Sequence, residues 1–138
     1  MTNPLLELVD LPLFDRILPT HVGPAIDDLL AKAETALAQV TADDFPATWN
    51  GIAAVLDVAT ENLGRAWGAV SHLNSVADTP ELRAAYNAAL PRVTEFWTRL
   101  GADERLYAKY KSIDVATLNT EQRQAHKKCG AQFRVVRR

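Results

Sequence analysis

The sequence predicts an all-α protein in which a proline-containing arm precedes a set of amphipathic helices. Apolar residues recur every three or four positions through most of the chain, as they do on one face of a helix. A strong helix-start signal, a hydroxyl followed by proline and glutamate, occurs at Thr79-Pro80-Glu81. No segment shows the strict alternation of apolar and polar residues that is typical of a half-buried strand.

The first segment, residues 1–20, contains prolines at positions 4, 12 and 19, which exclude one continuous helix there. We therefore expect an extended N-terminal arm that lays its apolar side chains on an apolar surface. These side chains are Leu8, Leu11, Phe14 and Ile17.

The helical region is expected over residues 21–128, and its first helix begins at His21, with Pro24 in the first turn, where a missing N–H costs little. After the loop TADDFPA, Thr48 is a good N-cap for a second helix that ends near Val70. The apolar positions of the first helix are Val22, Ile26, Leu29, Leu30, Ala33, Leu37 and Val40. Those of the second are Trp49, Ile52, Leu56, Ala59, Leu63, Ala66, Trp67 and Val70.

A third helix is expected to start after Thr79, and Pro91 is expected to kink it. A short fourth helix covers DERLYAKYKSI, and a fifth opens at Thr120. The apolar positions of the third helix are Leu82, Tyr86, Ala89, Val93, Trp97 and Leu100.

Composition places the chain among soluble globular proteins. It has 138 residues, of which 48% are hydrophobic and 23% charged, too apolar for a disordered chain. A net charge of -2 gives no reason to expect a basic face for nucleic acid, and no apolar run approaches the roughly 20 residues that span a bilayer. The start carries no secretory signal, and a lone cysteine suits a reducing compartment. We expect a cytoplasmic protein with neither a nucleic-acid nor a membrane partner.

The segment VSHLNSVADTPELRAAY holds His72, which we place in the connection between the second and third helices. A catalytic imidazole needs a nucleophile to deprotonate and an acid to orient it. The nearby groups are Ser71, Ser75 and Asp78. Their closeness in sequence is uninformative, so a structural role for His72, bonding backbone groups of the connection, is favoured over catalysis. The same holds for His21 at a helix start.

His126 and Cys129 are three residues apart and could contact one metal ion from one helical face. Zinc needs three or four ligands, and no second Cys/His pair completes the set. The motifs HExxH, GxxxxGK[ST], GxSxG and GxGxxG are all absent from this sequence. We therefore expect no catalytic residue, no metal ligand and no cofactor in this chain, and no substrate-binding residue is indicated.

Several segments in order resemble the N-terminal region of the M3 family of zinc oligopeptidases, of the oligopeptidase A type. They are MTNPLL, LPLFDRILPTHVGPAI, TWNGI, LGRAWGAVSHLNSVADTPELRAAYNAALP, ERLYAKYKSI and TLNTEQRQ. The resemblance runs from Met1 to about Lys128. Its most specific parts are the SHLNSV…TPELRxAY block and the PxHVxPA helix entry.

The resemblance implies an almost entirely helical protein several times longer than this chain, with a channel that admits short peptides. In the family, zinc is held by an HExxH helix and a later glutamate, far downstream of the part matched here. It activates a water for metal-assisted hydrolysis. None of those ligands, nor the general base, has a matching position in this sequence, so the resemblance assigns the chain to the non-catalytic half.

The resemblance stops at residues 129–138, CGAQFRVVRR, where the family pattern reads like ALRDFxLSG. Codons for these residues can be chosen so that reading from the next base gives AARNFELSG. We therefore interpret the tail as out-of-frame sequence after a one-base frameshift near residue 128, and we expect it to fray past Lys128. The alternative is a genuine divergent C-terminus.

Two functions follow from these observations. The first is a non-catalytic N-terminal fragment of a cytosolic zinc metallo-oligopeptidase, whose full-length form hydrolyses short peptides with zinc. The second is a stand-alone helical module that binds a protein or peptide partner. In either case we expect self-association through exposed apolar helix faces.

Overall fold

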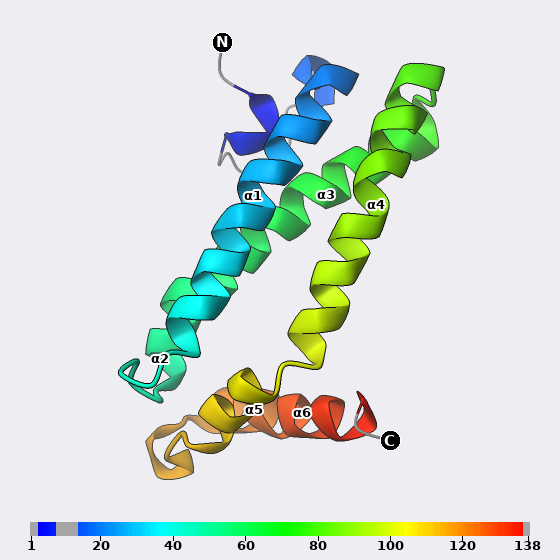
Figure 1. Cartoon of the computed structure of the whole chain (residues 1–138). Coiled ribbons are helices and arrows are strands. Elements are labelled where there is room, and N and C mark those ends of the chain that lie inside the picture. The colour runs from blue at the N-terminus through cyan, green and yellow to red at the C-terminus, as the bar shows by residue number, and fades with distance from the viewer. Residues whose placement is uncertain (1–2, 8–13, 137–138) are drawn as a thin grey trace.

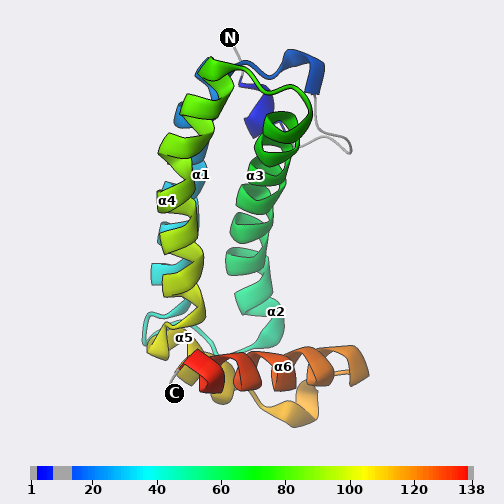
Figure 2. The ribbon, with the colours of Figure 1, turned by 90° about the vertical axis from the view of Figure 1, so that its right-hand side faces the viewer.

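The computed structural model describes residues 3–7 and 14–136, with side chains through Lys128. Over these residues it contains helices and no strand, which confirms the all-α prediction. Three long helices, α1 (Pro19–Val40), α3 (Val58–Val76) and α4 (Pro80–Gly101), run alongside one another (Figure 1). Two further helices, α5 (Glu104–Lys111) and α6 (Thr120–Val136), lie across one end of them (Figure 2).

The prolines suggested an extended arm. Its described part instead contains two 3₁₀ turns, η1 (Pro4–Leu6) and η2 (Phe14–Arg16). Asn3 stabilises the first turn, because its Oδ1 accepts from the Leu5 N–H at 3.1 Å while its Nδ2 donates to the His21 carbonyl at 2.9 Å. Leu5 is buried and Ile17 packs against the core, whereas Phe14 is 38% exposed. Leu8 and Leu11 lie outside the described residues.

Helix α1 begins at Pro19, two residues before the expected start, so Pro24 lies in its second turn and not its first. Its apolar face is as the spacing predicts, since most of the expected positions are buried. The buried ones are Val22, Ile26, Leu29, Ala33, Leu37 and Val40.

The second expected helix is one continuous helical segment made of α2 (Trp49–Ile52), the π-helical turn η3 (Ala53–Asp57) and α3. Thr48 caps it as predicted, because its hydroxyl accepts from the Gly51 N–H at 3.1 Å. The segment ends at Val76, six residues later than expected, which places His72 inside the helix.

Helix α4 starts as predicted, with the Thr79 hydroxyl accepting from the Leu82 N–H at 3.1 Å. It continues through Pro91 to Gly101 without interruption. One prediction for the apolar face of α4, that Trp97 lies on it, was wrong. Phe96 is 1% exposed and fills the core, whereas Trp97 is 38% exposed. Residues three and four positions after Val93 both lie near the buried face, and the smaller ring takes the interior place.

Two clusters of buried side chains hold these helices together. The main core lies between α1, α3 and α4, and its largest fully buried members are Val22, Ile26, Leu63, Val70, Val93 and Phe96. The second core joins the end of α1 and the start of the second helix to α5 and to the residues on either side of the turn η4 (Val115–Thr117). Its members are Ala36, Leu37, Val40, Ile52, Leu56, Leu106, Ile113 and Leu118.

The last two helices also begin where the sequence indicates. Asp103 caps α5 by accepting from the Leu106 N–H at 3.0 Å, and α6 opens at Thr120. The backbone of α6 is helical through Val136, so the expectation that an out-of-frame tail frays after Lys128 was wrong. The side chains of residues 129–138 lie outside the described part of the structure.

Candidate functional site

His72 lies in the last turns of α3 and not in a helix connection. Its ring is exposed and contacts Phe14 of the arm, with ring centroids 5.2 Å apart and planes tilted by 56°. This contact attaches the arm to α3 through an aromatic pair. The contact described for the His72 side chain is this ring pair and not the expected bonds to backbone groups of a connection.

The neighbours of His72 have local partners of their own. The Ser75 hydroxyl donates to the Ser71 carbonyl at 3.1 Å, one turn earlier in α3. Asp78 is paired with Arg83, and the hydrogen bond from this guanidinium holds the pKa of the Asp78 carboxyl below its ordinary value. A general base would need a free acceptor aimed at a nucleophile. The first of these contacts lies within α3, and the second joins the connection after α3 to the start of α4.

His21 caps the start of α1. Its Nδ1 accepts from the Leu18 N–H at 2.9 Å, and its backbone N–H donates to the Leu18 carbonyl at 2.9 Å. The imidazole thus does what glutamate does in a capping box, reaching back from the third helical position to the cap backbone. Because Nδ1 accepts, any proton of the neutral ring lies on Nε2. The imidazole therefore stabilises the start of α1.

His126 places α6 against α5, since its Nε2 lies 2.8 Å from the Tyr110 carbonyl. The side chain of Cys129, which was weighed with His126 as a metal ligand and rejected, lies outside the described residues. Among the residues that the structure does describe, no three of His, Cys, Asp and Glu come together as metal ligands. Since zinc needs three or four such ligands, the zinc of the resembled family does not fit the described part of this chain.

The carboxyl of Asp57 has a raised pKa. Burial, and then the negative charge of nearby Glu61, raise the pKa of Asp57 above its ordinary value. Asp57 ends the π-helical turn η3, and its carboxyl is partly buried although the residue as a whole is exposed. A single carboxylate with a raised pKa can take up a proton, but acid–base chemistry needs a second positioned group.

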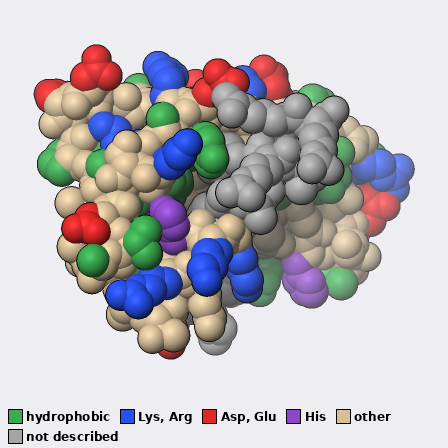
Figure 3. All heavy atoms as spheres, turned by 90° about the horizontal axis from the view of Figure 1, so that it is seen from below, with side chains coloured by type: hydrophobic (Ala, Val, Ile, Leu, Met, Phe, Trp, Pro, Cys, Tyr) green, Lys and Arg blue, Asp and Glu red, His purple; other side chains and the backbone are tan. Residues whose placement is uncertain are grey.

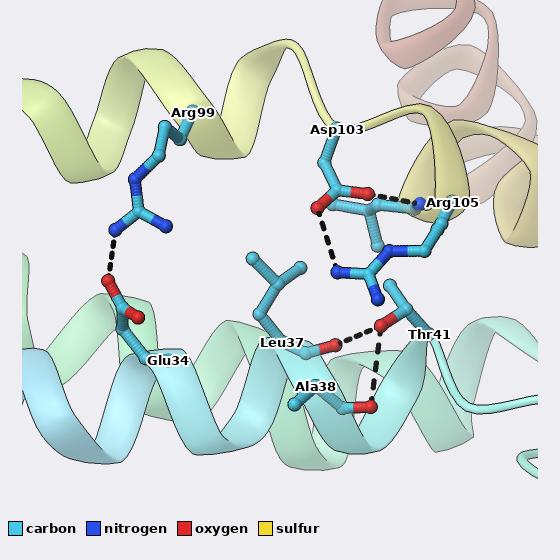
Figure 4. A network of polar contacts seen from close by, with 8 residues as sticks. Glu34, Leu37, Ala38, Thr41, Arg99, Asp103 and Arg105 are labelled. Atoms are coloured by element: carbon cyan, nitrogen blue, oxygen red, sulfur yellow. Dashed lines mark hydrogen bonds and ion pairs between the residues drawn. The ribbon is translucent and has the colours of Figure 1, made fainter.

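Two ion pairs join α4 to α1, Arg92 with Asp27 and Arg99 with Glu34. Figure 4 shows Arg99 of α4 reaching down to Glu34 of α1. Each pair connects residues 65 positions apart, so α1 and α4 run in the same direction. The sequence analysis missed both pairs, although a signal existed: the two acids are seven residues apart, and so are the two arginines.

The sequence also provided no indication of the hydrogen bonds that Lys109 makes. Its ammonium donates to the carbonyls of Ala42 at 2.9 Å and Phe45 at 2.7 Å, both in the loop after α1. Nearby, the Thr41 hydroxyl donates to the Leu37 carbonyl at 2.8 Å and ends α1 (Figure 4). Lys109 therefore fixes α5 to the end of α1.

One view of the surface and the length of the helices bear on the expected absence of nucleic-acid and membrane partners. The face seen from below carries side chains of both signs, with several Lys and Arg side chains gathered on one part of it (Figure 3). No described helix combines the length and the apolar character needed to cross a bilayer.

Comparison with known proteins gives a consistent result. The family model described as the N-terminal domain of neurolysin/thimet oligopeptidase matches residues 26–136. The chain belongs to this family of M3 oligopeptidases. It corresponds to an N-terminal segment, since the part that matches is the family's N-terminal domain.

Several similar proteins carry the name oligopeptidase A. The protein of that name from Escherichia coli (strain K12) is 43% identical over 129 residues, which cover 91% of this chain but 19% of the relative. The one from Haemophilus influenzae is 38% identical over 113 residues, or 82% of this chain and 16% of the relative. "Probable cytosolic oligopeptidase A" from Arabidopsis thaliana is 38% identical over 112 residues, or 81% and 16%. The chain thus spans less than a fifth of the length of the curated relatives it matches.

Proposed function

We propose that this chain is the non-catalytic N-terminal part of a cytosolic zinc metallo-oligopeptidase that hydrolyses short peptides as a whole protein. One observation carries the proposal. The oligopeptidase A of Escherichia coli aligns with 91% of this chain while only 19% of the relative is covered. What the name of the relative describes therefore belongs to a protein about five times longer than the matched region.

The contacts of the described residues support the non-catalytic part of the proposal. His21 and His126 each hydrogen-bond a backbone group through one ring nitrogen, and the ring of His72 packs on Phe14. The described carboxylates and imidazoles do not converge on a common point. The zinc ligands and the general base are accordingly assigned to the remaining four fifths of the whole protein, and this region supplies helical scaffold.

A cytosolic location is part of the same proposal. It is supported by the name of the Arabidopsis thaliana relative that includes the word cytosolic, and by a single cysteine, which suits a reducing compartment. Another relative from the same plant is named an organellar oligopeptidase A. Fractionation of the source cells, followed by detection of the chain, tests this part, and recovery in a membrane or extracellular fraction would contradict it.

The non-catalytic role is tested by assaying the purified chain with zinc and short fluorogenic peptides. Hydrolysis should not exceed that of a blank without protein, because neither a metal tetrad nor a general base is provided. His72→Ala is the matched variant, and it should also equal the blank. Cleavage that a chelator stops, and that His72→Ala removes, would overturn both the non-catalytic role and the structural role of His72.

A further inference from the structure

From position 84 to position 100, the charged residues of α4 lie on one side of the helix. Between positions 84 and 100 they are Arg92, Glu95 and Arg99, and both arginines pair with acids of α1. The edge of α4 that faces α3 is different. It carries Tyr86, Leu90 and Trp97, which share a face because four and eleven residues return a helix close to the same direction. From Tyr86 to Trp97 this edge of α4 is uncharged and apolar; Arg83, one turn before Tyr86, is paired with Asp78.

The Tyr86 ring fixes where this edge lies. It stacks on Trp67 of α3, with ring centroids 4.9 Å apart and planes 9° from parallel. The stack is near the connection between the two helices. Farther along, α3 and α4 separate toward the end covered by α5 and α6, and they contact each other much less than each contacts α1 (Figures 1 and 2). Trp97 lies in that separated half and is 38% exposed.

The adjoining surface of α3 carries two glycines, which have no side chain. Gly64 lies one turn before Trp67, and Gly68 lies one turn after Gly64. A Cβ atom at either position would meet no other atom within 4 Å. Glycine weakens a helix interior relative to alanine, and packing among the described residues does not require it here. Glycines four residues apart on an exposed helix face allow the backbone of another helix to come close.

We propose that the α3–α4 face, formed by Gly64, Trp67, Gly68, Tyr86, Leu90 and Trp97, docks an apolar helix from the remaining four fifths of the peptidase. This inference rests on the proposed function. The absence of charge along the α4 edge favours a buried apolar partner over a charged one. The length of the relatives identifies the source of that helix, because over 80% of each relative's length has no counterpart in this chain.

The test compares each variant in two settings, the 138-residue chain alone and a chimera in which the chain replaces the matching region of Escherichia coli oligopeptidase A. In the chain alone, Trp97→Lys should lower the unfolding midpoint only modestly, since 38% of Trp97 is already exposed there. Gly64→Leu should raise the midpoint, because it improves helix propensity and meets open space. In the chimera, both variants should shorten the half-life of peptidase activity at elevated temperature by about tenfold or more.

Val76→Lys is the control, since Val76 is 66% exposed at the end of α3 and outside this face. It should leave the half-life of the chimera unchanged. If the chimera is active but Trp97→Lys and Gly64→Leu act alike in both settings, the docking face is wrong and the proposed function stands. If a folded chimera is inactive, the proposed function itself fails. If Trp97→Lys abolishes only self-association of the chain and spares the chimera, the face binds a second copy, and the proposal is overturned.

Discussion

Lys109 is expected to be the most important charged residue for the stability of the folded chain. Its ammonium satisfies two loop carbonyls, at 2.9 Å and 2.7 Å, and it joins α5 to the end of α1 beside the second core. A hydrogen bond from a charged donor is worth about 1.5–3 kcal/mol. The side chain is half-buried, so water can replace part of this when the ammonium is removed. We expect Lys109→Met, which keeps the apolar stem, to cost about 2 kcal/mol of unfolding free energy.

The assay is urea unfolding followed by far-ultraviolet circular dichroism, with Lys111→Met as the matched control. Lys111 is on the same helix and is exposed, so its replacement should change the free energy by no more than about 0.5 kcal/mol. Amide exchange should accelerate in the loop around Ala42 and Phe45 only in the Lys109 variant. Equal unfolding free energies for the two variants would show that Lys109 does not fix α5, and the reasoning would be refuted.

Three further predictions concern single contacts. His21→Ala should destabilise the chain by about 1 kcal/mol, measured by urea unfolding, because the Leu18 N–H loses its acceptor; no change would remove the capping role. Reversing both charges of the Arg99–Glu34 pair (Arg99→Glu with Glu34→Arg) should restore part of the roughly 0.5 kcal/mol lost in Arg99→Glu alone, because the new glutamate still faces Glu95, and a double variant no better than the single one would argue against the pair. Asp57→Asn should raise the urea midpoint at pH 7. The folded state raises the pKa of Asp57, so ionisation favours unfolding, and the advantage of the asparagine should vanish below the ordinary pKa of 3.8; an advantage that persists at low pH would contradict this.

The helices could be predicted from sequence because their signals are local. Apolar spacing located α1, and the hydroxyls of Thr48 and Thr79 located the next two starts. Boundaries set by tertiary contact were less predictable. The second helix runs to Val76, and His72 follows it into the helix, where Phe14 of the arm supplies a contact that no local pattern announces.

The interhelical contacts differ in how far the sequence could have predicted them. The matched spacing of Asp27 and Glu34 with Arg92 and Arg99 was a usable signal for two parallel helices, and it was overlooked. The role of Lys109 could not be read in advance, because it depends on where α5 lies relative to a loop over 60 residues earlier.

The most direct test of the proposed function is the peptidase activity of the chimera that carries this chain in the place of the matching region of Escherichia coli oligopeptidase A. If the chain is the scaffold part of such an enzyme, the chimera should cleave short peptides in a chelator-sensitive manner, while the chain alone stays at the level of the blank. A chimera that folds but cleaves nothing, or a chain that cleaves by itself, would contradict the account.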